Sequence, residues 1–121
     1  MNHAERYCWN ELKTDQPLAL LSRKRVIGEK MMISEITLQK GCSVPLHQHE
    51  NEQFSCVLRG CLRFTTRTAD GSMKELDVRA GEVLHLPSQV PHSVIAIEET
   101  LVLDLFSPPS ATTGIDQPRA H

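Results

Sequence analysis

Residues 41–60, GCSVPLHQHENEQFSCVLRG, carry His47, His49 and Gln53 at even spacings. Side chains at even spacings lie on the same face of an extended strand. His47 and His49 can therefore reach one point, and Gln53 can reach it too if the strand resumes after a polar turn. Imidazole nitrogens suit zinc, copper, iron and nickel, and an amide oxygen can complete the ligand set. This stretch predicts a metal site.

A second stretch, residues 81–92 (GEVLHLPSQVPH), supplies a fourth candidate ligand, His92, at the end of a loop made rigid by two prolines. A single histidine in an apolar strand is more often packed or solvated than a ligand. The histidines of the two stretches taken together are stronger evidence for a metal site, because glycines and prolines frame both stretches. We predict one divalent transition metal (nickel, zinc, iron or manganese), whose identity the sequence leaves open. Its predicted ligands are His47, His49, Gln53 and His92.

The two stretches resemble the two motifs of the cupin superfamily, G-x5-H-x-H-x3-4-E-x6-G and G-x5-P-x-G-x2-H-x3-N. Every spacing of the first motif fits residues 41–60, with Gln53 where glutamate is usual. In the second motif, Gln89 replaces the usual glycine and Ala96 the usual asparagine. The resemblance spans about residues 26–108, and it implies an all-β double-stranded β-helix, the jelly-roll barrel of cupins.

Within the cupins, HQHENEQFSCVLRG looks most like the small KdgF group of pectin-degradation proteins, which also use glutamine at this position and linearise unsaturated monouronates. Their catalytic carboxylate and aromatic ring occur as Asp-x-Phe, which Asp104-Leu105-Phe106 matches. The resemblance therefore implies that Asp104 and Phe106 are catalytic, and that the protein is a homodimer. An arginine four residues beyond that phenylalanine is also implicated in the group. This chain has Ser110 there, which leaves recognition of a uronate carboxylate open.

Outside the motifs the sequence also predicts an all-β fold. Strand-like runs are separated by turns containing Gly, Pro or Asp about every 8–12 residues, as in sandwiches and barrels. We divide the chain into an N-terminal segment packing on the barrel (1–25), a cupin barrel (26–108) and a flexible C-terminal tail (109–121) rich in Pro, Ser and Thr. A short helix is considered near residues 17–21.

Composition narrows the function classes. The 121 residues suggest one domain, and a formal net charge of −2 argues against binding nucleic acid or an anionic membrane. No apolar run approaches about 18 residues, and the N-terminus lacks the apolar core of a signal peptide, so we expect a cytoplasmic protein. The basic run 23–25 is expected to be a solvated strand end. Four cysteines without a Cys-x-x-Cys pair are expected to be free thiols: Cys8, Cys42, Cys56 and Cys61.

Asp104 is the only polar residue in LVLDLF, residues 101–106. Alternation places it on the same face as Phe106. If that face points into the barrel, both side chains share a cavity with the metal; otherwise Asp104 faces solvent or pairs with an arginine. His85, which lies before the His92 loop, either lines the cavity or faces outward.

The donor set suggests a class of reaction. Three neutral imidazoles and a neutral amide leave the charge of a dication uncompensated, so the site should attract an anionic or chelating oxygen ligand. With Asp104 as general acid or base, we favour a lyase or isomerase acting on a sugar-acid-like molecule. Two alternatives stay open: a metal-dependent dioxygenase, and a non-enzymatic, metal-bearing protein that binds a small molecule.

Overall fold

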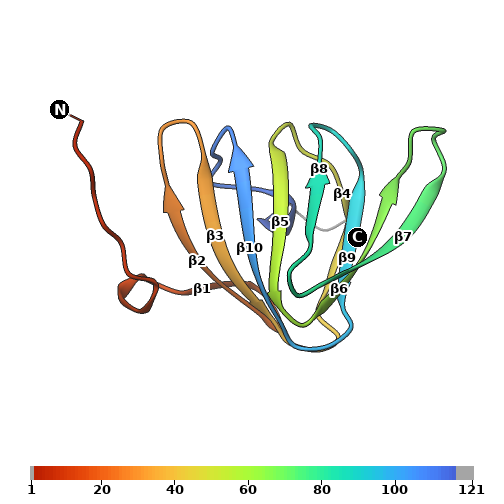
Figure 1. Cartoon of the computed structure of the whole chain (residues 1–121), viewed down its shortest axis with the longest axis horizontal. Helices are drawn as coiled ribbons and strands as arrows, with labels where there is room; N and C mark the ends of the chain where they lie inside the picture. Colours follow the sequence, from red (N-terminus) through yellow and green to blue (C-terminus); the bar gives the residue numbers. More distant parts are fainter. Residues whose placement is uncertain (1, 117–121) are drawn as a thin grey trace.

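A computed structural model describes residues 2–116 of the chain. These residues form ten β-strands and two short 3₁₀-helices, with no α-helix among them (Figure 1). The elements are η1 (Trp9–Glu11), β1 (Asp15–Leu18), β2 (Leu21–Ile27), β3 (Met32–Leu38), β4 (Ser43–His47), β5 (Glu52–Arg59), β6 (Cys61–Arg67), β7 (Met73–Arg79), β8 (Val83–Leu86), β9 (His92–Ala96), β10 (Thr100–Ser107) and η2 (Gly114–Asp116). The predicted all-β class is confirmed.

The strands form two antiparallel sheets. The larger has the order β1-β2-β3-β10-β5-β8 and the smaller the order β4-β9-β6-β7. Figure 1 shows the larger sheet from β2 to β8, with β10, late in the chain, inserted between β3 and β5. Strands distant in sequence thus become neighbours, which is typical of a jelly roll and agrees with the predicted cupin barrel.

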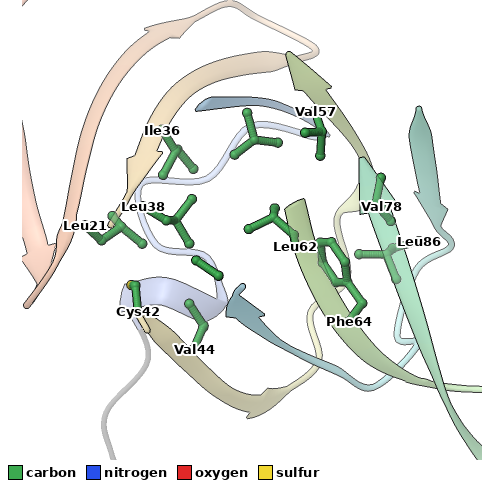
Figure 2. Close-up of a cluster of buried hydrophobic side chains, with 12 residues drawn as sticks. Leu21, Ile36, Leu38, Cys42, Val44, Val57, Leu62, Phe64, Val78 and Leu86 are labelled. Carbon is green, nitrogen blue, oxygen red and sulfur yellow. The ribbon is translucent and has the colours of Figure 1, made fainter. Parts of the chain in front are cut away.

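The core lies between the sheets. In β3 and β10, buried and half-buried residues alternate along the whole strand, as expected when one face covers an interior. Figure 2 shows the buried side chains converging from both sheets. They are Leu21, Ile36, Leu38, Cys42, Val44, Val57, Leu62, Phe64, Val78, Leu86, Ala96 and Val102. Each large aliphatic side chain buried here contributes roughly 1.5–3 kcal/mol.

The first motif ends at Gly60 because the turn between β5 and β6 requires a glycine. Its φ is +98°, a conformation that residues with a side chain rarely adopt. A Cβ at this position would lie 2.4 Å from the backbone oxygen of Glu99 and 2.4 Å from Oγ1 of Thr100. The close approach of these chains leaves room only for a hydrogen atom.

The sheet starts earlier than the predicted barrel. β1 and most of β2 precede residue 26 and pair with each other. The short helix considered near residues 17–21 is wrong, because β1 and a tight turn occupy that region. Leu18 packs against the core from β1, so burial in the sheet overrides the weak local preference for a helix.

The segment after β10 closes one side of the sandwich. η2 contacts β1, an edge strand of the larger sheet, and β4, an edge strand of the smaller one. Ile115 packs against the core from this segment. Residues 117–121 of the predicted flexible tail lie outside the described residues.

Arg23 fastens this segment to the sheet. Its guanidinium donates hydrogen bonds of 2.8 and 2.9 Å to Asp116 and of 2.7 and 3.1 Å to Asp15. The side chain is directed inward from β2, and the residue is only 3% exposed. The expectation of a solvated basic run is therefore wrong for Arg23, because two carboxylates from distant parts of the chain compensate its charge.

Two further features concern the environment of the chain. None of the four cysteines, all of which lie within residues 2–116, forms a disulfide. Among the same residues, no helix is long and apolar enough to cross a membrane. The cytoplasmic localisation stays a prediction.

Candidate metal centre

Three histidines converge at one end of the barrel. His47 is the last residue of β4 and lies opposite His92, the first residue of β9. His49 belongs to the loop that leads into β5. One ring nitrogen from each histidine lies within 4.8 Å of the others. The ring centroids are 4.2 Å apart for His47 and His92, 5.2 Å for His49 and His92, and 5.7 Å for His47 and His49.

A backbone carbonyl lies next to the Nδ1 atom of each histidine. The distances are 2.7 Å from His47 to Pro45, 3.0 Å from His49 to Asn51 and 2.9 Å from His92 to Val90. A carbonyl oxygen can only accept, so each Nδ1 carries the proton and each neutral ring keeps its lone pair on Nε2. Histidines that bind metals through Nε2 are oriented in this way by a second hydrogen bond.

Gln53, on β5, brings an oxygen to the same place. Its Oε1 lies 3.1 Å from Nε2 of His49, while its Nε2 donates to Oγ of Ser55 at 2.9 Å. With the proton of His49 on Nδ1, two acceptor atoms face each other, which is unfavourable unless a cation or a proton lies between them. Three imidazole nitrogens and one amide oxygen therefore fit a divalent metal ion, although the ligand assignment itself stays a prediction.

Asp104 lies beside this group and is directed inward. The residue is 8% exposed, and Oγ of Ser55 donates a 2.7 Å hydrogen bond to Oδ1 of its carboxylate. Burial raises its pKa to about 6, against the opposing effect of hydrogen bonds from Ser55 and Gln53. No salt bridge to Asp104 occurs among residues 2–116. Of the alternatives considered from the sequence, the structure shows the inward orientation.

Phe106 follows two residues later on the same face of β10. Its ring lies edge-on to that of His49, with the centroids 5.9 Å apart. The side chain is buried and lines the same cavity as Asp104. It therefore supports the position of His49 and supplies an apolar wall.

All six predicted site residues line one cavity, together with apolar core residues and, from the C-terminal segment, Thr113 and Ile115. The cavity measures about 30 Å³, which suits an ion or a single water molecule, and it is partly open. His47 and His49 are half-buried, so the group is accessible from solvent.

The structure shows the surroundings of the residues that depart from the cupin motifs and from the KdgF group. Gln89 has a φ of +67°, the left-handed conformation in which glycine is the least strained residue, and its N–H donates to the carbonyl of His49 at 2.8 Å. Ala96 is buried in the core. Ser110 donates its hydroxyl to the carbonyl of Thr112 at 2.6 Å, within the C-terminal segment.

His85 faces outward from β8. Its Nε2 lies 2.7 Å from a carboxylate oxygen of Glu52, and its ring stacks on Phe54 with a centroid distance of 4.8 Å. Of the two directions that the sequence left open, the structure shows the outward one.

Sequence reasoning missed Ser55 and the C-terminal lining residues. Ser55 follows Gln53 by two positions on one strand, so strict alternation could have placed it on the inner face. No such signal exists for Thr113 and Ile115, because their place in the cavity depends on how the chain returns after β10.

Comparisons with known proteins agree with this architecture. Among curated proteins, the chain is 30% identical over 77 residues to the oxalate decarboxylase OxdC of Bacillus subtilis (strain 168). That match covers 64% of this chain and 20% of OxdC, so the chain spans about a fifth of its relative's length.

Several solved structures share the fold. KdgF from Halomonas sp. has a TM-score of 0.78 at 23% identity, covering 90% of this chain and 97% of that one. An RmlC-like cupin from Shewanella frigidimarina NCIMB 400 has a TM-score of 0.75 at 24% identity, covering 92% and 97%. B. subtilis oxalate decarboxylase, described for its Mn(II) centres, has a TM-score of 0.78 at 20% identity, covering 92% and 32%.

The family described as "Cupin domain" matches residues 34–106. This range contains both motifs, most of the two central strands of the larger sheet, and all six residues predicted to form the site. The match covers more than half of the chain, and the protein therefore belongs to the cupin domain family.

Proposed function

We propose that this cupin is a metal-dependent enzyme of the lyase or isomerase type that acts on a small, sugar-acid-like substrate, as KdgF proteins do on unsaturated uronates. The observation that carries the proposal is Asp104, a buried carboxylate that no cation compensates among the described residues. It shares its cavity with three histidines whose Nδ1 atoms are held by backbone carbonyls.

The residues would divide the work as follows. A divalent ion held by His47, His49, Gln53 and His92 would supply a Lewis acid that polarises a substrate oxygen. Asp104 would accept a proton from the substrate and return it at another atom. The pKa of about 6 caused by burial suits this role near neutral pH, and a neighbouring dication would lower that pKa and favour the ionised base. Phe106 would exclude water from one side of the reacting group.

The dimensions of the cavity limit how a substrate binds. A cavity of about 30 Å³ holds an ion but no sugar ring. We propose that the substrate lies on the solvent side of His47 and His49, and that only its reacting oxygens reach inward. Neutral ligands leave net positive charge at this end of the barrel, so an anionic substrate is favoured.

A second candidate is metal-dependent oxidative or decarboxylating chemistry on a small carboxylate. The 30% identity to an oxalate decarboxylase supports it, and the Mn(II) centres of that enzyme are compatible with a histidine-rich site. A dioxygenase belongs to the same group of alternatives. Non-enzymatic binding of a small molecule is the outcome if metal is present but none of these substrates is converted.

One set of measurements separates these functions. Elemental analysis of protein purified without added metal gives the metal and its stoichiometry. The protein is then incubated with an unsaturated monouronate under air and under nitrogen, and the open-chain product is followed by NMR. Linearisation that is equally fast in both atmospheres supports the proposal. Dioxygen consumption, or formate released from oxalate, favours the second candidate.

We also propose that the protein forms a homodimer through the outer face of the larger sheet. Phe54, Leu58 and Val83 are exposed on β5 and β8, by 42%, 50% and 57%. A second copy related by a two-fold axis would cover the same patch on both chains. Light scattering should give twice the 13.6 kDa of one chain. A Leu58→Lys/Val83→Lys variant should be monomeric, whereas a monomeric wild type would contradict the proposal.

A further inference from the structure

We propose that Ser55 is a positioning residue that holds the amide of Gln53 with its oxygen toward the histidines, and that the carboxylate of Asp104 sets the direction of this hydrogen-bond chain. The inference rests on the proposed metal site, because it concerns which atom Gln53 presents there.

Three short contacts define the chain. Oγ of Ser55 donates to Asp104 at 2.7 Å, Nε2 of Gln53 donates to Oγ of Ser55 at 2.9 Å, and Oε1 of Gln53 then lies 3.1 Å from Nε2 of His49. A carboxylate only accepts, so the single proton of the Ser55 hydroxyl is committed to Asp104. The lone pairs of that hydroxyl can then take only a donor from Gln53, namely its NH₂ group. The carbonyl oxygen of the amide is left toward His49.

The strand register brings these groups together. Gln53 and Ser55 are two residues apart on β5, and Asp104 on β10 lies directly opposite Ser55. Gln53 is 5% exposed and Ser55 is fully buried, so bulk water does not replace a lost partner at this position. Each polar atom depends on the next one in the chain.

The same chain explains an amide at position 53. A glutamate there would place a second acceptor against Ser55, and two buried carboxylates would compete for one hydroxyl proton. Gln53 is thus matched to Asp104 through Ser55. This gives the departure from the glutamate of the cupin motif a cause within the chain itself.

Removing the hydroxyl should release the amide. In Ser55→Ala, the NH₂ group of Gln53 loses the 2.9 Å acceptor Oγ of Ser55 and keeps only its interaction with Asp104, so it can turn toward the lone pair on Nε2 of His49. That orientation forms a hydrogen bond in the metal-free protein and withdraws the oxygen from the metal. Loss of a group that orients a ligand typically weakens metal binding about 10–100-fold.

The first experiment measures the affinity of each variant for Zn²⁺ by chelator competition. We expect Ser55→Ala to bind about 10–100-fold more weakly than wild type, and Ser55→Thr, which keeps the hydroxyl, to stay within about threefold. Ser34→Ala is the matched control: Ser34 is equally buried and lies opposite Asp104 on β3, the strand on the side away from Gln53. It should bind as wild type does.

A double variant tests the orientation directly. A carboxylate presents an oxygen whichever way it turns. In a Gln53→Glu background, the Ser55→Ala substitution should therefore lower the affinity for Zn²⁺ by less than about threefold. An equal loss in the wild-type and Gln53→Glu backgrounds would show that Ser55→Ala disturbs the site in another way, and it would overturn the inference.

The second experiment needs no metal and no variant that might fold poorly. In the ¹⁵N-labelled, metal-free wild type, the side-chain NH₂ of Gln53 should exchange slowly with solvent, because one of its protons is donated to Ser55. Rapid exchange would overturn the inference even if the protein binds metal. Slow exchange in a wild type that binds no metal would instead support the hydrogen-bond chain and contradict the proposed function.

Discussion

Two clusters of buried polar side chains in this barrel shift the pKa of their carboxylates in opposite directions. At the edge formed by β1, β2 and η2, Arg23 pairs with Asp15 and Asp116. Hydrogen bonding to Arg23 lowers the pKa of Asp15, and the same contact lowers the pKa of Asp116 even though burial acts in the opposite direction. At the barrel end, Asp104 has only hydroxyl and amide partners within residues 2–116, and burial raises its pKa to about 6.

The difference separates a structural cluster from the cluster that is proposed to be functional. A buried charge is costly unless a partner compensates it. The Arg23 cluster contains its own compensation and joins the C-terminal segment to the sheet. The Asp104 cluster contains a carboxylate and three histidines but no cation among the described residues, so it can accept a positive charge from outside. The predictions below alter one cluster at a time.

The largest effect should come from the histidines. His47→Ala/His49→Ala removes two of the four predicted ligands, so metal content should fall from about one equivalent to background, a loss of affinity of about 10³-fold or more. Elemental analysis after dialysis measures it. His85→Ala is the control, because His85 faces outward and should leave the metal in place. Full metal content in the double variant would refute the ligand assignment.

The next effect should come from Arg23. Arg23→Met removes the hydrogen-bonded cation of Asp15 and Asp116 and leaves only Arg25, 3.8 Å from Asp15. The cost should be about 3 kcal/mol, which lowers Tm by about 10 °C. Arg63→Met breaks a pair of similar length, 2.8 Å to Asp77, but Arg63 is 42% exposed. It should leave Tm nearly unchanged, since solvent screens such pairs. Thermal unfolding measures Tm in both variants. Equal decreases in Tm would show that burial does not make the Arg23 cluster more important for stability than an ordinary surface ion pair.

Asp104→Asn tests the functional cluster. At saturating metal, which offsets any loss of affinity through Ser55 and Gln53, the variant should keep its fold and lose turnover of the true substrate by about 10²-fold or more, the usual scale for a general acid or base. Steady-state kinetics should show the loss in kcat more than in KM. Asp77→Asn, at an exposed ion pair, serves as the control. Unchanged turnover in Asp104→Asn would end the proposed catalytic role.

The smallest effect concerns pH and the metal-free protein. Folded Asp104 keeps its proton up to a pH of about 6, whereas an aspartate in the unfolded chain releases it near the ordinary pKa of 3.8. The native state therefore binds more protons in this window, and its stability falls as pH rises. Between pH 4 and 7, the wild type should lose about 2 kcal/mol relative to Asp104→Asn.

Denaturant unfolding at several pH values measures this difference. His92 acts in the opposite sense. Burial lowers its pKa to about 4, so its contribution to the stability of the protein is lost as pH falls below 6.5. Its contribution is present in both proteins and cancels in the comparison. A stability difference independent of pH would contradict the raised pKa of Asp104.

The prediction from sequence succeeded where local periodicity carries the information. Strand alternation predicted that His47, His49 and Gln53 lie together, and they do line one cavity. The route differs, because β4 ends at His47 and the loop that carries His49, rather than one strand face, leads to Gln53 on β5. The same rule placed Asp104 with Phe106. Prediction from the local sequence failed for Arg23. A run of basic residues suggests side chains exposed to solvent, and only the tertiary structure shows that the distant carboxylate of Asp116 compensates the charge of Arg23.

By itself, the sequence determined the all-β class, the cupin family, and the residues at the barrel end, because strand alternation and motif spacing are short-range properties. Only the tertiary structure decided which partners these residues have. The return of the chain after β10 sets Ile115 into the cavity and Asp116 against Arg23, and the register of β5 against β10 sets Ser55 opposite Asp104. Such pairings arise between residues far apart in sequence, and no local pattern encodes them.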